Sequence, residues 1–252
     1  MLHLFIGWDP NEQDAYKVAA HSAVRRSSLP LVVHPVKERP LRQEGLYTRP
    51  YSVTASGQRV DGLDGKPFST EFSFTRFLVP HIARKLGLSG QVLFCDGDFL
   101  FLSDLADLFR DTDQRSVVSV VKHNYLPLNN SKMDGQSQEQ YRRKLWSSLM
   151  MFNLDHPRLD KLDAEYVNTH CGQTLHHFDW VGDDLIGEID ERWNWIPGAS
   201  PTIKSGFHWA PNAVHFTEGV PYVHPNKEKT PFAEDWLAEY EHLMITNPMG
   251  FR

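Results

Sequence analysis

Short hydrophobic runs and a helical periodicity alternate at the start of the chain. The runs at residues 2–6 and 31–36 have the length and composition of strands that are buried on both faces. Residues 11–26 between them have helical spacing, and Asp9 or Asn11 is available as the N-cap. This order of strand, helix and strand predicts a parallel sheet with helices packed on its faces.

The following segment is first irregular and then helical. Residues 38–70 are rich in Gly, Pro, Arg and Ser, which predicts mostly loop with one short helix near 41–46. Residues 72–86 carry hydrophobic side chains at helical spacing. Because Pro80 lies inside this stretch, we expect a kink or a break into two helices.

Two more strands are expected before the middle of the chain. The hydrophobic run 91–95 and the β-branched run 116–121 are both bounded by polar residues. Between them, Ser103 is placed to cap a short helix that ends near Phe109, with Asp104 in its first turn.

The second half of the chain has fewer regular patterns. Residues 122–143 are polar, which predicts a flexible loop, and residues 145–154 are apolar again. Helices are expected at 158–171 and 233–244. Residues 172–230 are irregular and rich in Trp, His, Gly and Pro, which is typical of a binding face carried on loops.

Composition and charge exclude several classes of protein. The 252 residues include 26 Lys and Arg against 32 Asp and Glu, and the net charge of −6 argues against a nonspecific nucleic-acid binder. No apolar run reaches the ~18 residues of a membrane span, and the N-terminus lacks the basic region of a signal peptide. Two cysteines cannot build a disulfide framework. We therefore expect a cytoplasmic protein without a transmembrane segment; peripheral membrane contact and the oligomeric state stay open.

Two carboxylates stand inside a hydrophobic stretch. Asp96 and Asp98 are embedded in the otherwise apolar residues 92–102. In a continuous strand their side chains share one face, and Gly97 permits a bend between them. Because an isolated buried charge is costly, the pair calls for a cation, and oxygen ligands favour Mg²⁺ or Mn²⁺ over zinc. The structural alternative is that Asp96 caps backbone amides while Asp98 faces water.

This stretch and four other blocks together resemble the nucleotide-sugar-dependent glycosyltransferases with the GT-A fold, and glycosyltransferase family 8 and its bacterial relatives above all. The blocks follow the family's order from residue 2 to about 222. They are Val92–Phe109, Phe5–Asp9 with Asp14–Tyr16, Phe74–Pro80, Trp180–Asp184 with Trp193–Trp195, and His215–Tyr222.

The resemblance implies a fold and an activity. It implies a single GT-A-like α/β domain over residues 1–252 with a mostly parallel central sheet. The nucleotide-binding half would be about 1–121 and the acceptor-side half about 122–252. The implied activity is transfer of a sugar from a nucleotide-sugar donor, expected to be a UDP-sugar, to a carbohydrate or other hydroxyl acceptor. Mn²⁺ (or Mg²⁺) and retention of configuration are implied with it.

The family's site roles can be carried over to particular residues. The implied metal ligands are Asp96, Asp98 and His215. The implied nucleotide-binding residues are Asp9, Tyr16, Arg76, Asp96 and Gly219. Asp184, or its neighbour Asp183, would lie near the anomeric carbon and stabilise positive charge there. Structural alternatives stay open: capping for Asp9, and an ion pair with the acids for Arg76.

The chain departs from the family pattern in its closing block and in its "D-Q" block. Val220 stands where the family has the lysine that neutralises the diphosphate, and the candidates to replace it are Lys204, Lys227 and Lys229. The "D-Q" is replaced by two adjacent carboxylates, Asp183-Asp184.

Two other functions stay open at this point. The missing lysine also fits a non-catalytic protein that binds a nucleotide or a carbohydrate. A sugar-nucleotidyltransferase likewise places carboxylates and Mg²⁺ on an α/β sheet. That class usually has a glycine-rich basic loop after the first strand, whereas the turn at Trp8–Glu12 is acidic.

Overall fold

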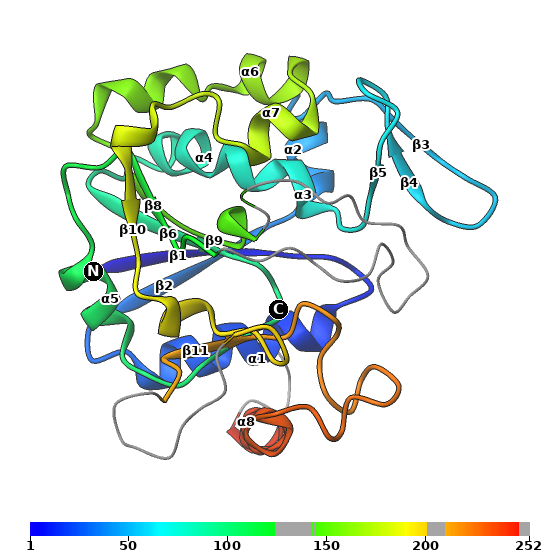
Figure 1. Cartoon of the computed structure of the whole chain (residues 1–252), viewed down its shortest axis with the longest axis vertical. Coiled ribbons are helices and arrows are strands. Elements are labelled where there is room, and N and C mark those ends of the chain that lie inside the picture. Colours follow the sequence, from blue (N-terminus) through cyan, green and yellow to red (C-terminus); the bar gives the residue numbers. More distant parts are fainter. Residues whose placement is uncertain (124–142, 144, 201–209, 247–252) are drawn as a thin grey trace.

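A six-stranded sheet forms the centre of the computed structural model, which describes residues 1–123, 143, 145–200 and 210–246 (Figure 1). Its strands are β1 (Leu2–Gly7), β2 (Leu31–Val36), β6 (Gln91–Cys95), β8 (Val118–Val120), β9 (Leu149–Asn153) and β10 (Ile186–Glu188). The order across the sheet is β10-β8-β9-β6-β1-β2. Only β9 runs antiparallel to its neighbours in this sheet. The predicted α/β fold with a mostly parallel sheet is thereby confirmed.

The register of the sheet aligns the ends of its parallel strands. Ile6 near the end of β1 pairs with Cys95, the last residue of β6. Gly7 and Asp96 therefore emerge at the same edge, where the parallel strands end. Pro35 is accommodated in β2 because β2 is an edge strand, so a missing backbone N–H need not break a ladder.

Helices cover both faces of the sheet (Figure 1). The α-helices are α1 (Gln13–Arg26), α2 (Glu38–Gln43), α3 (Phe72–Thr75), α4 (Val79–Lys85), α5 (Leu105–Asp111), α6 (Ala164–Thr169), α7 (Gly172–His176) and α8 (Ala233–Thr246). The 3-10 helices are η1 (Arg76–Leu78), η2 (Trp146–Ser148), η3 (Pro157–Lys161), η4 (Asp183–Leu185) and η5 (Glu191–Asn194). Helices α4, α6 and α7 lie on one side of the sheet, and α1 and α8 lie on the other.

Successive residues of β1 enter two different hydrophobic clusters. Phe5 packs with Phe77 and other residues on the side of α4, whereas Leu4 and Ile6 pack with Ala19 of α1. All three β1 side chains are at most 1% exposed. Burial on both faces explains why this strand is a continuous apolar run rather than an alternating one.

The helical segment before β6 breaks where the sequence predicts. Residues 72–86 form α3, η1 and α4 in succession, and Pro80 lies in the first turn of α4. A proline is tolerated there because the first N–H groups of a helix have no intrahelical acceptor. Gly87 then ends the segment with a φ of +74°.

Two predicted helix caps are wrong. Residue Glu12 occupies the N-cap of α1 without a side-chain bond, and Asp9 Oδ1 instead accepts from the backbone N–H of Asn11. Asp104, not Ser103, caps α5 by accepting from the N–H of Ala106. In both cases a residue type that is common at N-caps was present in the sequence. The path of the loop before the helix decides which side chain reaches a backbone amide.

The expectation of mostly loop with one short helix at 38–70 is right about the helix but misses a small sheet. The segment contains α2 and a small antiparallel sheet of β3 (Tyr51–Val53), β4 (Arg59–Asp61) and β5 (Pro67–Phe68). It extends from one side of the molecule (Figure 1). Arg49 and Asp61 form a buried ion pair at its base, with both side chains 1% exposed. A buried charge pair replaces much of the apolar pattern from which strands are recognised.

The elements of the C-terminal half also differ in detail from those predicted. The predicted helix 158–171 is divided into η3 and α6, because Asp163 caps a new helix by accepting from the N–H of Tyr166. The apolar run 145–154 starts as η2 before it becomes β9. The helix at 233–244 is confirmed as α8. The predicted loop at 122–143 lies almost wholly outside the described residues.

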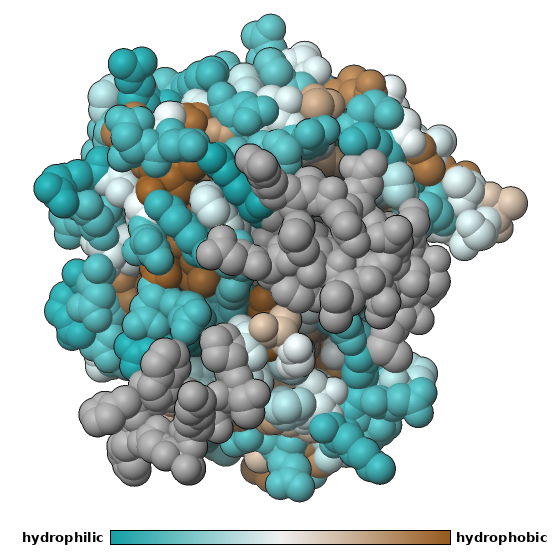
Figure 2. Space-filling view, in the orientation of Figure 1, coloured by the Kyte–Doolittle hydropathy of each residue, from teal (hydrophilic) through white to brown (hydrophobic). Residues whose placement is uncertain are grey.

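The visible surface is mixed in character. Figure 2 shows hydrophilic side chains over most of one face, with hydrophobic side chains visible near β8 and the edge strand β10. Within the residues that the structure describes, no helix combines the length and the apolar composition that a membrane crossing needs.

Candidate functional site

Asp96 and Asp98 flank a tight turn at the end of β6. The turn joins β6 to β7 (Phe99–Phe101), so the chain bends at Gly97, as the sequence allowed, and the two acids do not lie on one continuous strand. A Cβ on Gly97 would lie 2.7 Å from the backbone oxygen of Gly7. Because that contact is with backbone, no side chain can be accommodated between the two carboxylates.

His215 reaches the same place from a separate sheet. It is the last residue of β11 (Ala213–His215), which pairs antiparallel with β7 and places His215 opposite Phe99. The two rings stack with their centroids 4.4 Å apart. The imidazole Nε2 lies 3.1 Å from Asp98 Oδ1 and 3.9 Å from Asp96 Oδ2.

These three residues, called the triad below, have the chemistry of a cation site. One ligand atom from each lies within 4.8 Å of the others. The carboxylates are 16% and 17% exposed and the imidazole is 2% exposed. Two carboxylates and one imidazole suit Mn²⁺ or Mg²⁺ and leave coordination positions for water or a phosphate. The donor set therefore fits the predicted metal.

Arg76 is held against the acid pair. Its Nη1 is 2.8 Å from Asp96 Oδ1 and donates to the backbone oxygen of Ser147 at 2.9 Å. Nε donates to the backbone oxygen of Phe72. The side chain is nearly buried, so the structural ion pair that the sequence left open is present; contact with a nucleotide stays a prediction.

Asp9 lies at the end of β1 and is bound on both oxygens. Oδ2 accepts from the backbone N–H of Glu71 at 2.9 Å and from Arg59 Nη1 at 3.2 Å, while Oδ1 is engaged by Asn11. Burial and the nearby Asp9 raise the pKa of Glu71. Asp9 therefore accepts from two backbone amides without being the N-cap of α1, and its contact with Arg59 connects the small sheet to this edge.

The predicted nucleotide-binding residues Tyr16 and Gly219 are described by their immediate neighbours. Burial raises the pKa of Tyr16 on α1 to about 12, so its hydroxyl keeps its proton. Gly219 follows β11 with a φ of +106°, and a Cβ there would lie 2.7 Å from the ring of His224. The turn after His215 therefore requires glycine.

The three lysines proposed to replace the family lysine differ in placement. Lys204 lies outside the described residues, and Lys229 is exposed. Lys227 is 8% exposed, and its Nζ is 2.9 Å from Oε2 of Glu218, in the turn after β11.

Asp183 and Asp184 lie in η4, directly before β10. Since β10 runs parallel to β8, they are at the edge where parallel strands begin, whereas the triad is where β6 ends. Both are exposed, and the hydrogen bond from Arg143 Nη2 at 2.6 Å lowers the pKa of Asp183. Their role at the anomeric carbon stays a prediction that this placement does not favour.

Several polar residues around the triad were not singled out from sequence. Asn194 and Ser148 are buried beside His215, and His123 lies close to both His215 and Asn194. Burial and the nearby His215 lower the pKa of His123 to about 4. A usable signal was present for Asn194, which is an amide between the two buried tryptophans Trp193 and Trp195.

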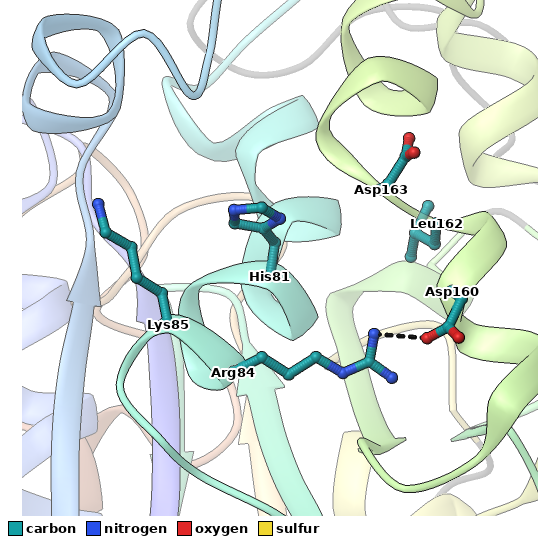
Figure 3. Close-up of a pocket in the computed structure, with 6 residues that line it drawn as sticks. All are labelled: His81, Arg84, Lys85, Asp160, Leu162 and Asp163. Atoms are coloured by element: carbon teal, nitrogen blue, oxygen red, sulfur yellow. Dashed lines mark ion pairs between the residues drawn. The ribbon is translucent and has the colours of Figure 1, made fainter.

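A cavity of about 300 Å³ lies elsewhere, between α4 and the η3–α6 region (Figure 3). Arg84 Nη1 and Asp160 Oδ1 form an ion pair of 2.8 Å in it. Its lining residues are His81, Arg84, Lys85, Asp160, Leu162 and Asp163. None of them belongs to the predicted site.

Several solved glycosyltransferase structures are similar to this chain in fold. The galactosyltransferase LgtC in complex with donor and acceptor sugar analogues has a TM-score of 0.56 and 14% identity, with 96% of each chain covered. The bifunctional glycosyltransferase WbbM has a TM-score of 0.60 and 13% identity, and the match covers 95% of this chain but 49% of WbbM. GlyE from Streptococcus pneumoniae has a TM-score of 0.53 and 12% identity, with 100% of this chain and 66% of GlyE covered.

At such low identities these likenesses establish the fold alone, which is the GT-A fold predicted from the sequence. No family model matches the chain. A much closer relative in sequence is Protein CDI from Arabidopsis thaliana, which is 39% identical over 244 residues. The match covers 97% of this chain and 88% of the relative. The chain therefore belongs to the family of Protein CDI and is built on the GT-A glycosyltransferase fold.

Proposed function

We propose that this protein is a metal-dependent glycosyltransferase that transfers a sugar from a nucleotide-sugar donor to a hydroxyl acceptor. The observation that carries the proposal is the convergence of Asp96, Asp98 and His215 where β6 ends in a GT-A fold. Open α/β sheets bind ligands at the carboxyl ends of their strands. A diphosphate leaving group requires a cation there, and two carboxylates in this geometry can hold one.

The proposed chemistry depends on charge at the departing diphosphate. A bound Mn²⁺ or Mg²⁺ would stabilise the negative charge that develops on it. The triad would hold that ion, and Arg76 fixes Asp96 in place through the ion pair at 2.8 Å. Gly97 lets the turn between the two acids pack against the backbone oxygen of Gly7, which brings both carboxylates to the same place.

The finer assignments are part of the same proposal. The donor is a UDP-sugar, the metal is Mn²⁺, the transfer retains configuration, and the protein is cytoplasmic. Asp9, Tyr16, Arg76 and Gly219 contribute to the nucleotide side of the site. Lys227 supplies a positive charge on the loop after His215; its contact with Glu218 in the turn after β11 supports this choice over the exposed Lys229.

The test is release of nucleoside diphosphate. The protein is incubated with Mn²⁺ and a panel of nucleotide sugars, with and without a panel of sugar acceptors. We expect release from one donor class, a loss of at least about tenfold in Asp98→Asn, and wild-type release in Asp113→Asn. Asp113 is the matched control because it is a surface acid paired with Arg115. Asp184→Asn and Lys227→Met in the same assay test those two assignments.

Three results would contradict the proposal or its metal dependence. Tight nucleotide binding with no release under any donor and acceptor combination would identify a non-catalytic binding protein. Turnover that requires pyrophosphate would identify a nucleotidyltransferase. Equal release by wild type and Asp98→Asn would remove the metal from the proposal.

A further inference from the structure

Two buried side chains outside the triad connect His215 to Asp96. Asn194 Oδ1 is 2.8 Å from His215 Nδ1, and Asn194 Nδ2 is 2.9 Å from Ser148 Oγ. The backbone oxygen of Ser148 accepts from the backbone N–H of Asp96 at 2.9 Å. Asn194 is 0% exposed and Ser148 is 2% exposed. We call these two residues the Asn194–Ser148 bridge.

The direction of each hydrogen bond in the bridge follows from the available protons. Ser148 Oγ donates its one proton to the backbone oxygen of Leu145 at 2.5 Å. It can therefore only accept from Asn194, which identifies the amide atom facing it as nitrogen. The amide oxygen then faces His215 and can only accept, so His215 Nδ1 carries a proton. Nε2 is the nitrogen left for a cation, and it is the one 3.1 Å from Asp98 Oδ1.

The surroundings of the bridge hold it in one geometry. Leu145 has a φ of +73°, which a side chain larger than glycine rarely adopts. In that conformation its carbonyl accepts from both the N–H and the hydroxyl of Ser148. The ring of Phe99 stacks on the face of His215, while Asn194 binds its edge. The imidazole is thus fixed in plane, tilt and tautomer.

We propose that Asn194, supported by Ser148, is a positioning residue for the metal site: it holds the tautomer and orientation in which His215 Nε2 faces Asp96 and Asp98. The inference rests on the proposed metal dependence. Groups that bind the second nitrogen of a metal-ligating histidine orient the ring and raise its basicity, and their loss lowers metal affinity. The same bridge couples the position of His215 to the backbone of Asp96.

The test measures Mn²⁺ affinity directly, by electron paramagnetic resonance of free Mn²⁺ titrated with the full-length protein. Asn194→Leu removes the acceptor and should weaken Mn²⁺ binding by about 10- to 100-fold. Asn194→Asp keeps an oxygen for His215 Nδ1, and the Ser148 hydroxyl would turn its proton from Leu145 to the second carboxylate oxygen; this variant should bind Mn²⁺ more tightly than Asn194→Leu. Ser148→Ala frees the Asn194 amide to rotate. The Mn²⁺ affinity of this variant should lie between those of Asn194→Leu and Asn194→Asp. Urea unfolding in EDTA establishes that each variant is folded.

Asn168→Leu is the matched control. Asn168 is also a structural amide, which accepts from the N–H of Thr48 and donates to the backbone oxygens of Leu46 and Ala164, away from the triad. Its loss should destabilise the fold and leave Mn²⁺ affinity unchanged. A role of Asn194 in stability alone would make Asn194→Leu behave in the same way, and that result would overturn the inference.

Three further results of the Mn²⁺ titration would overturn the inference or part of it. Wild type and Asn194→Leu with equal Mn²⁺ affinity overturn the inference while leaving the proposed function intact. An Asn194→Asp variant as weak as Asn194→Leu excludes the acceptor role. A wild-type protein that binds no Mn²⁺, with Asp98→Asn indistinguishable from it, overturns both the metal dependence and this inference.

Discussion

At the scale of single residues, the charge of Asp96 is balanced from inside the protein. The Arg76 guanidinium pairs with Asp96, carries two further backbone hydrogen bonds, and lies over the rings of Phe72 and Phe94. With all these contacts its position is fixed before any ligand binds. Part of the site is therefore preorganised without a metal.

Replacing Arg76 should lower the stability of the protein, because Asp96 loses this ion pair. Arg76→Gln leaves a largely buried carboxylate without its partner, so we expect the free energy of unfolding in EDTA to fall by about 2–3 kcal/mol. Saturating Mn²⁺ should recover part of this loss, because a cation supplies the missing positive charge. Urea unfolding with EDTA and with Mn²⁺ measures both values.

The control is Arg110→Gln, which removes an ion pair whose guanidinium is 67% exposed. Exposed pairs contribute less than about 1 kcal/mol. Equal losses for the two variants, or a loss in Arg76→Gln that Mn²⁺ does not reduce, would speak against this role of Arg76.

His176 is a second residue whose charge state is tied to the fold. Its Nδ1 is 2.8 Å from Ser147 Oγ, and its ring meets the ring of Phe77 edge-on. Burial, followed by the nearby Arg76, lowers the pKa of His176 well below its usual value of 6.5. The folded protein therefore disfavours the protonated ring.

This shift predicts a pH dependence of stability. Below pH ~6.5 the unfolded chain binds a proton at this histidine that the folded chain does not, so the free energy of unfolding should rise with pH through this range. His176→Asn removes the titrating group and should flatten the curve between about pH 4.5 and 6.5. Urea unfolding at several pH values tests this, and parallel curves for the two proteins would contradict it.

The residues of the site differ in how readily the sequence reveals them. Asp96 and Asp98 stand out because charge interrupts an apolar run, and His215 is recognised from the block around it. The bridge residue Asn194 is marked in the sequence only as an amide between two tryptophans, and its role cannot be read there because its partners His215 and Ser148 are distant in sequence. Which of several carboxylates or lysines completes a site likewise depends on loop paths that periodicity does not encode.

At the scale of secondary-structure elements, one buried carboxylate fastens α8 to α1. The side chain of Glu239 is 1% exposed, and its oxygens lie 2.6 Å from His21 Nδ1 and 2.7 Å from Arg26 Nη1. Arg25 Nε approaches the same carboxylate at 3.3 Å. All three partners lie on α1, whereas Trp236 and Leu243 bury the apolar side of α8.

Neutralising Glu239 should loosen this helix pair. In Glu239→Gln one amide replaces a carboxylate shared by several cationic side chains, and we expect a loss of about 2 kcal/mol in the free energy of unfolding. In this variant, hydrogen exchange at the backbone amides of α8 should also be faster than at those of the central sheet. Glu241→Gln, an exposed position on the same helix, should change stability by less than about 0.5 kcal/mol. Equal behaviour of the two variants would show that apolar packing alone holds α8.

The elements that the sequence predicted share a clear periodicity. β1 and β6 are apolar runs buried in the sheet, and α1 and α8 span several turns. The expected burial of β2 on both faces is wrong, because β2 is an edge strand whose residues are mostly half-buried. The strands β3 to β5 escaped prediction because each has two or three residues and their anchor is the Arg49–Asp61 ion pair. Helix caps were misplaced by one to three residues: Asp104 rather than the adjacent Ser103 reaches an amide of α5, and α1 begins after Glu12 without a side-chain cap.

At the scale of the whole molecule, the two halves of the chain are interleaved. Strand β9 from the second half lies between β6 and β8 from the first and reverses direction. The succession of strands and helices predicts a mostly parallel sheet, but it does not encode which strand is inserted between two others. That order depends on long-range packing, such as the pairing of Cys95 with Leu149, which carries Ser148 to the site.

The pairing of β7 with β11 has a consequence for biosynthesis. Asp96 and Asp98 are synthesised more than a hundred residues before His215. Until β11 adds to β7, a nascent chain presents two carboxylates without their imidazole. The three side chains of the triad can therefore come together only after β11 has been synthesised.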